Sequence, residues 1–452
     1  MQGIFDHFVK GFERAHASQA GAERRIGAEL KFPLVDRDGQ AVCLDVLRAL
    51  WKYLAGRGWQ PVVDTMTKEV IGARRRGERN DTVASSETGY CKTEFALAHV
   101  ANLFDLEHAI IALRAELRPF AERHEVRFLG YGIHPVTPPS ERLLMNKSRT
   151  SVWDKVFPSN RHIRPEDGDD VHLFTVNAAS HVHVSVPRDE AIPLVNVLNG
   201  FAGAQIALTA HSNIWRGRID PTYRCVAEKF WDWWMPDADR VGVPRVPFDH
   251  LEHYVDTIAS FKPVYVKRNG QPILLSRYDS FGEYYCSGRP VGVTLDGEEI
   301  PLKPEPADID LHSTCYWYNA RLSRHYTVEN RVNDQQPPDD LLAVAALTLG
   351  LAAALHEASE EISSYDWEHL RAAREAACRD GLSGCAGPFL LSETATQMLL
   401  IARLGLRRRG LGEERFLAPL EARLAARTCP ADEAAMIFKT RGLQALLDDR
   451  TL

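Results

Sequence analysis

The sequence predicts an α+β fold, in which a curved and mainly antiparallel sheet forms a concave site, with flanking helices and a helical C-terminal region. Two observations support this prediction. Four separate segments alternate apolar and polar residues with the period of two that is typical of a half-buried strand. From residue 337 onward the pattern is almost wholly helical. We therefore expect a sheet-containing unit over residues 1–335 and a helical region over 336–452 that packs on it.

Each of the four strand-like segments has one apolar face and one face with reactive side chains. The polar faces carry Glu29 and Lys31 in the first segment, Glu94 in the second, His181, His183 and Ser185 in the third, and Glu329, Arg331 and Asn333 in the fourth. One polar face is common, because antiparallel sheets often have a solvated side. Four such faces indicate a sheet that curves around hard cations and an anionic ligand.

The second segment also contains Glu87, which lies an odd number of residues from Glu94. One unbroken strand would point the two carboxylates to opposite faces. The Thr88-Gly89 pair between them supplies a break that lets both converge. The alternative for this segment alone is a surface strand with two solvated glutamates.

The remaining elements follow from local patterns. Asn269-Gly270 predicts a two-residue hairpin between strands at 263–267 and 271–275. Arginine-rich residues 74–79 predict a solvated hairpin loop or a phosphate-facing lid, and acidic residues 166–170 predict a turn. Helices are expected at 4–18, 42–57, 104–124, 188–211, 248–261, 341–362, 367–379, 392–409 and 413–426, further strands at 59–70, 82–98 and 126–134, and a helical, loop-rich stretch at 140–160.

Composition limits the function classes. The 452 residues are 45% hydrophobic and 25% charged, as in ordinary soluble globular proteins, and the net charge of -7 argues against nucleic acid as the main partner. The eight cysteines form no Cys-x-x-Cys pair, which predicts reduced thiols and a cytoplasmic location. The longest apolar run, 341–355, is too short to span a bilayer comfortably. We expect small-molecule partners, with no nucleic acid and no membrane.

The ordered segments resemble the glutamate–cysteine ligase family, in its plant and proteobacterial branch, whose sheet fold is related to the catalytic domain of glutamine synthetase. Residues 27–32 are similar to the family's Gly-x-Glu-x-Glu opening strand, and 86–89 with Glu94 to its Glu-Pro-Gly-Gly…Glu segment. Residues 128–135 resemble a strand that ends in a Gly-x-x-Pro corner, the histidine pair falls on a polar strand of the family, and 329–334 match a Glu-x-Arg-x-x-Asp block.

The resemblance implies an ATP-dependent carboxylate–amine ligase. ATP would phosphorylate a carboxylate, such as the γ-carboxyl of glutamate, and an amine such as that of cysteine would attack the acyl phosphate. Phosphoryl transfer of this kind uses divalent metal ions, here two or three Mg²⁺, and a positioned cation. The implied roles are Mg²⁺ ligation by Glu29, Glu87, Glu94 and Glu329, nucleotide contact by His181, His183 and Arg331, catalysis by Arg331 and Lys31, and substrate binding by Arg216 and Arg224.

Lys31 departs from the family, which usually has a second acid in the opening strand. The lysine either removes one metal site or replaces the charge of a metal ion with a fixed cation. Two alternatives to the glutamate–cysteine reaction therefore stay open: the same chemistry with another amine, aminoacyl or peptide acceptor, and a non-catalytic module that binds nucleotide or amino acid. The helical C-terminal region could support a homodimer, and we expect the tryptophans of 231–234 to pack rather than stack on adenine.

Overall fold

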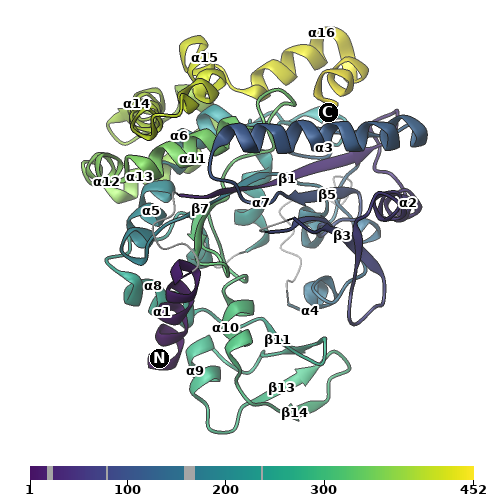
Figure 1. Cartoon of the computed structure of the whole chain (residues 1–452), viewed down its shortest axis with the longest axis vertical. Coiled ribbons are helices and arrows are strands. Elements are labelled where there is room, and N and C mark those ends of the chain that lie inside the picture. The colour runs from purple at the N-terminus through teal and green to yellow at the C-terminus, as the bar shows by residue number, and fades with distance from the viewer. Residues whose placement is uncertain (18–23, 78–79, 157–167, 236–237) are drawn as a thin grey trace.

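The structure is a computed structural model, which describes residues 1–17, 24–77, 80–156, 168–235 and 238–452 (Figure 1). Nine strands form the main sheet, in the order β16-β17-β7-β1-β5-β4-β3-β2, with β6 paired to the end of β1. All of its strand pairs are antiparallel. The bounds are β1 Ile26–Val35, β2 Gln60–Val63, β3 Val70–Arg75, β4 Thr82–Ser86, β5 Lys92–Ala96, β6 Arg127–Phe128, β7 Ser180–Ser185, β16 Ala320–Leu322 and β17 Thr327–Asn330. The predicted fold class is confirmed.

Strand β1 lies at the centre of this sheet. Its apolar residues Ile26, Leu30 and Phe32 are fully buried on one face, so the alternation of the strand directs Glu29 and Lys31 to the other face. The register pairs Lys31 with Glu94 of β5. It also pairs Glu29 with His181 of β7, and β7 in turn pairs His183 with Glu329 of β17. Backbone pairing alone therefore gathers the polar side chains of four strands on one face.

Helices cover the apolar face of the sheet. Helix α11 (Ala343–Ala353) packs on β1 and β7, α5 (Arg188–Gly200) on β16 and β17, and α2 (Leu44–Ala55) on β3. Helix α3 (Leu103–His124) runs across the sheet beside the C-terminal helices (Figure 1). One hydrophobic cluster joins residues from α1 to Ala431, so the core is continuous across the division that we predicted at residue 335, and that division stays a prediction.

The remaining elements lie outside the main sheet, and several of the helices pack behind α5 and α11. A small four-stranded sheet, with the predicted hairpin at Asn269-Gly270, lies apart from the main sheet (Figure 1). Both hairpin residues have positive φ, 52° and 80°, as a type I′ turn requires. The remaining bounds are α1 Gln2–Ala17, α4 Trp153–Val156, α6 Ala202–Thr209, α7 Val226–Trp234, α8 Leu251–Ser260, α9 Phe281–Cys286, α10 Pro306–His312, α12 Leu355–Ser363, α13 Trp367–Asp380, α14 Leu391–Arg409, α15 Ala418–Ala426, α16 Pro430–Arg450, β8 Ile214–Trp215, β9 Arg218–Ile219, β10 Val241–Gly242, β11 Tyr265–Arg268, β12 Gln271–Leu274, β13 Val291–Thr294, β14 Glu299–Pro301, β15 Trp317–Tyr318, β18 Cys385–Ala386 and β19 Phe389–Leu390.

Several predicted boundaries were wrong. The helix expected over 188–211 is two helices, bent by 53° at Phe201, and glycines 200 and 203 near the bend let Ile362 and Ala373 approach closely. The strand expected over 126–134 is regular only at β6, and beyond it single β-bridges join Leu129 to Thr451 and Ile133 to Asn177. The glycines of this stretch lie against the backbone of residues 336 and 211. Arg74 and Arg75 belong to β3 rather than to a loop. Residues 78–79 and 166–167 of the predicted arginine loop and acidic turn lie outside the described residues.

Two further expectations concern membranes and thiols. Among the described residues, no single helix is long and apolar enough to cross a membrane, whereas the bent pair α5–α6 reaches the required length and composition only when its two helices are taken together. All eight cysteines are free, as predicted, and five of them are buried.

The packing of α11 against α14 gives a prediction for stability. A Cβ atom at Gly405 would lie 2.0 Å from the carbonyl oxygen of Gly350, so Gly405→Ala forces the two helices apart. Alanine normally stabilises a helix interior relative to glycine, but here we expect a loss of about 1–3 kcal/mol in the free energy of unfolding. The exposed Leu400→Ala on the same helix is the control, with a change within about 0.5 kcal/mol. Urea denaturation measures both, and a stabilised Gly405→Ala variant would show that the helices are not in contact.

A second prediction concerns Asp334, which follows β17 and is 4% exposed. Its Oδ2 accepts hydrogen bonds from the backbone N–H of His211 (2.6 Å) and the hydroxyl of Ser212 (2.7 Å). Burial nevertheless raises the pKa of Asp334 from 3.8 to about 7. Between pH 4 and 7 the folded protein thus holds a proton that the unfolded chain has lost, so the contribution of Asp334 to stability falls by about 1.4 kcal/mol per pH unit as pH rises. Asp334→Asn removes the titrating group.

We therefore expect the difference in unfolding free energy, wild type minus Asp334→Asn, to decrease steadily from pH 4 to pH 7. Chemical denaturation at several pH values measures this difference. A difference that stays constant over the range contradicts the buried, proton-binding state of Asp334.

Candidate active site

A cavity of about 320 Å³ opens on the polar face of the main sheet. Four acids from separate segments line it: Glu29 on β1, Glu87 after β4, Glu94 on β5 and Glu329 on β17. The residues between β4 and β5 turn the chain, which brings Glu87 and Glu94 to the same cavity. The predicted convergence of the four acids is confirmed. The opposite wall comes from α7 and from residues 313–319, including Glu228, Trp231 and Trp317.

Lys31 lies among three of these acids. Its Nζ is 2.9 Å from Glu94 Oε2, 3.4 Å from Glu29 Oε2 and 3.7 Å from Glu87 Oε1. The same ammonium donates a hydrogen bond of 2.9 Å to Nδ1 of His181. Burial alone would lower the pKa of Lys31, but the three carboxylates raise it above its ordinary value. Lys31 is therefore a buried, permanently charged cation at the floor of the cavity.

The acids respond differently to this shared cation. Burial alone would raise the pKa of Glu29 and of Glu87, but Lys31 holds both well below the ordinary value. Burial, together with the negative charges of Glu29 and Glu87, raises the pKa of Glu94. One ammonium cannot neutralise three carboxylates, so Glu94 keeps its proton more easily than Glu29 and Glu87 do.

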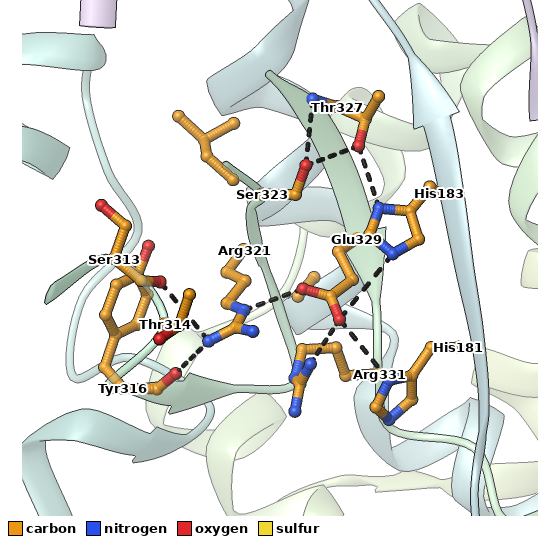
Figure 2. Close-up of polar contacts among 12 residues, drawn as sticks. His181, His183, Ser313, Thr314, Tyr316, Arg321, Ser323, Thr327, Glu329 and Arg331 are labelled. Carbon is orange, nitrogen blue, oxygen red and sulfur yellow. Dashed lines mark hydrogen bonds and ion pairs between the residues drawn. The ribbon is translucent and has the colours of Figure 1, made fainter. Parts of the chain in front are cut away.

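Glu329 is held by arginines rather than by the lysine (Figure 2). Arg321 Nε lies 2.8 Å from its Oε2, and the Arg331 guanidinium contacts its Oε1. These two cations outweigh burial and hold the pKa of Glu329 well below its ordinary value. Arg321 also donates to the carbonyl oxygen of Tyr316 at 2.6 Å, which fixes its guanidinium against the residue 313–316 segment.

Glu29, His183 and Glu329 form a group that fits a divalent cation. One donor atom from each lies within 4.8 Å of the others, in a set of two carboxylates and one imidazole. Thr327 holds Nδ1 of His183 at 3.0 Å, so Nε2 faces Glu29 at 3.1 Å. Such a partner on the outer ring nitrogen is typical of histidines that bind metal. The predicted ligands Glu87 and Glu94 belong instead to the group around Lys31.

The cavity is also lined by cationic side chains that no sequence pattern predicted. Lys92 donates to the side chain and backbone oxygens of Asn177, both at 2.8 Å, and Lys147 donates to the Ser86 carbonyl at 2.7 Å. Burial lowers the pKa of each lysine to about 8. Lys92 lies in β5 on the face opposite the apolar residues of that strand. Lys147 lies in the stretch 140–160, which we predicted only as helical and loop-rich. Trp231 and Trp317 stack on each other, with ring centroids 5.5 Å apart, and both line the cavity.

The two predicted substrate arginines lie elsewhere. Arg224 pairs with Asp432 at 2.9 Å and donates to the carbonyl of Arg379, and Arg216 lies over the ring of Trp215 at 3.4 Å. Neither belongs to the lining of the cavity. The sequence alone could not show which arginines of this segment face the cavity. The segment after the 188–211 helices has no periodic pattern that indicates where its side chains point. Arg321 and Arg331 are the arginines that reach the acid cluster.

Comparison with known proteins agrees with this arrangement. A sequence profile of glutamate–cysteine ligase family 2 matches residues 51–443. A Frankia alni protein named "Putative glutamate–cysteine ligase 2-2" is 26% identical over 430 residues, which cover 93% of this chain and 94% of that protein. A Rubrobacter xylanophilus protein named "Putative glutamate–cysteine ligase 2-3" is 31% identical over 151 residues, or 33% of this chain and only 39% of that protein. The chloroplastic glutamate–cysteine ligase B of Oryza sativa subsp. japonica is 24% identical over 335 residues, 72% of this chain and 63% of that protein.

Solved structures share the fold at low identity. The glutamate–cysteine ligase of Francisella tularensis in complex with AMP matches with a TM-score of 0.57 and 11% identity, over 95% of this chain and 87% of that chain. A bifunctional glutathione synthetase from Pasteurella multocida matches with a TM-score of 0.50 and 12% identity, over 96% of this chain and 51% of that chain. At such identities the likeness concerns the fold alone. The sequence profile, however, spans most of the chain, which therefore belongs to glutamate–cysteine ligase family 2.

Proposed function

We propose that this protein is an ATP-dependent ligase that joins the γ-carboxyl of glutamate to an amine, with cysteine as the first acceptor to test. The observation that carries the proposal is the convergence of four acids and several cations, from separate strands, on one cavity of a family member. Phosphoryl transfer needs positioned charge far more than it needs covalent chemistry from the protein. A buried cluster of this kind supplies such charge.

The reaction has two steps. The substrate carboxylate takes the γ-phosphoryl group of ATP, which forms an acyl phosphate and releases ADP. The amine nitrogen then attacks the acyl carbon, the amide bond forms, phosphate leaves and the nitrogen loses a proton. Both steps move negative charge onto phosphate oxygens, so they gain from cations that are already fixed before the reaction.

The residues divide this work between them. Glu29, His183 and Glu329 would hold a Mg²⁺ ion, which when bound draws negative charge from phosphate oxygens. Arg331 lies beside Glu329 and has a planar guanidinium that can bind phosphate or carboxylate oxygens in pairs. Lys92 and Lys147, on the Glu87 side of the cavity, supply two further donors for anionic groups. Arg321 keeps Glu329 ionised and in position.

The proposal is tested with purified protein, ATP, Mg²⁺, glutamate and a panel of amines. Release of ADP that requires cysteine, with the γ-glutamyl product found by mass spectrometry, supports the reaction as stated. Release that requires another amine assigns the same chemistry to a different acceptor. No release with any amine of the panel overturns the ligase proposal in favour of a binding module.

Glu29→Gln tests the role of the cavity itself. Glu29 contacts both His183 and Lys31, and the variant removes its charge while it keeps its shape. We expect kcat/KM for ADP release to fall by about 100-fold or more, because loss of a metal-binding charge weakens transition-state stabilisation by several kcal/mol. The control is Glu125→Gln, an exposed acid paired with Arg37 outside the cavity, with unchanged kinetics. Normal turnover by Glu29→Gln would remove Glu29 from the site.

A further inference from the structure

Two positively charged positions can be distinguished in the cavity. One is the group of donors formed by Glu29, His183 and Glu329. The other is already filled by the Lys31 ammonium, which lies within 3.7 Å of carboxylate oxygens from Glu29, Glu87 and Glu94. Among the described residues, Glu87 and Glu94 belong to no group of three metal donors. A carboxyl oxygen of each instead lies close to the lysine.

We propose that the Lys31 ammonium takes the place of one divalent cation, so that the protein itself holds a single metal ion, between Glu29, His183 and Glu329. This inference deepens the proposed function and rests on it for the identity of the ion as Mg²⁺. It also joins the two consequences that the sequence left open for Lys31. The lysine replaces the charge of a metal ion, and thereby also removes a metal site.

The position of the ammonium is fixed by the fold. Lys31 is only 6% exposed, and it lies on the central strand between the fully buried residues Leu30 and Phe32. The β1–β5 register places Lys31 directly opposite Glu94. The Lys31 side chain therefore lies beside the acids while its backbone stays paired in the sheet. Nδ1 of His181 accepts a further hydrogen bond from the ammonium. The cation is therefore held by four partners from three neighbouring strands and the turn after β4.

Charge explains why an ion and the ammonium exclude each other. A metal ion bound to oxygens of Glu29, Glu87 and Glu94 would occupy the space that Nζ occupies, and two cations a few ångströms apart in a buried site repel strongly. An acid in place of the lysine would have the opposite effect, because it would add a donor and leave the three carboxylates without a cation. The second donor group keeps Glu29 in common, but its other members are held by residues other than Lys31: Glu329 by Arg321 and His183 by Thr327.

A fixed ammonium also changes how the site depends on metal concentration. An ion that is part of the chain cannot dissociate, so this half of the acid cluster is neutralised at any Mg²⁺ level. It carries one charge rather than two, and its three N–H groups are already directed at the acids and at His181. The protein therefore gives up one coordination site for phosphate oxygens.

The experiment counts Mn²⁺ ions bound per chain in the absence of nucleotide, from the electron paramagnetic resonance signal of free Mn²⁺ during titration. We expect wild type to bind one Mn²⁺ tightly and His183→Gln to lose it. We expect Lys31→Met to bind one ion more than wild type, because three carboxylates are then left without their cation. Lys31→Glu should gain the same ion with a lower Kd.

The matched control is Lys92→Met. Lys92 is also a buried lysine of this cavity, but its ammonium bonds to the oxygens of Asn177 rather than to the acid cluster. We expect the number of Mn²⁺ ions bound by this variant to equal that of wild type. An equal gain in Lys92→Met would show a general effect of lost positive charge, and it would overturn the specific role of Lys31.

Two further results would overturn the proposal. One is a wild-type protein that binds more than one Mn²⁺ ion tightly at sites that are lost in Glu29→Gln. The other is a folded Lys31→Met variant that binds the same number of Mn²⁺ ions as wild type. The wild-type count needs no variant, so the proposal can fail even if both Lys31 variants unfold, which circular dichroism would reveal. The counts are measured without turnover. A protein that binds one ion as wild type and two as Lys31→Met, yet releases no ADP, would therefore keep this inference and lose the proposed function.

Discussion

Buried carboxylates repel one another unless cations lie between them, and this constraint governs the polar face of the main sheet. Glu29, Glu87 and Glu94 lie around Lys31, and Glu329 lies between Arg321 and Arg331. Each carboxylate that would be unfavourable alone thus has a positive partner at close range. The fold must hold these partners in register, because a slip of one residue in any strand would turn its acids into the apolar core.

The apolar face makes such a slip unfavourable. Residues that alternate with the polar side chains of the cavity, such as Leu30 in β1 and Val184 in β7, are fully buried under the helices. Packing of α11 and α5 on this face therefore fixes the orientation of side chains on the other face. Stability and function are divided between the two sides of the same strands, and α11 of the helical C-terminal region contributes to the site through this support.

Local alternation was enough to predict the faces of four strands, and hence Glu29, Lys31, His181, His183 and Glu329 as cavity residues. It could not predict which strands become neighbours, because pairing depends on contacts between distant segments. For the same reason Lys147, Arg321 and the stacked Trp231 and Trp317 were not identified as cavity residues. Each of them reaches the cavity from a loop, from a strand of three residues or from the opposite wall.

Arg216 and Arg224 show the converse limit. Both arginines were chosen because cations should bind an anionic substrate, but Arg224 instead pairs with Asp432 of α16, a helix whose bounds we did not predict within the helical C-terminal region. The continuous helix expected over 188–211 failed for a related reason. Its glycines are positions of close contact with α12 and α13, which only the tertiary structure reveals.

We infer that the acids of separate strands hold cations in one shared cavity. A crystal soaked with Mn²⁺ and a non-hydrolysable ATP analogue, with anomalous scattering recorded for manganese, tests this most directly. We expect an anomalous peak bounded by Glu29, His183 and Glu329, phosphates of the nucleotide beside it, and no peak at the Lys31 ammonium. Manganese and phosphates bound elsewhere on the molecule, with this cavity empty, would contradict it.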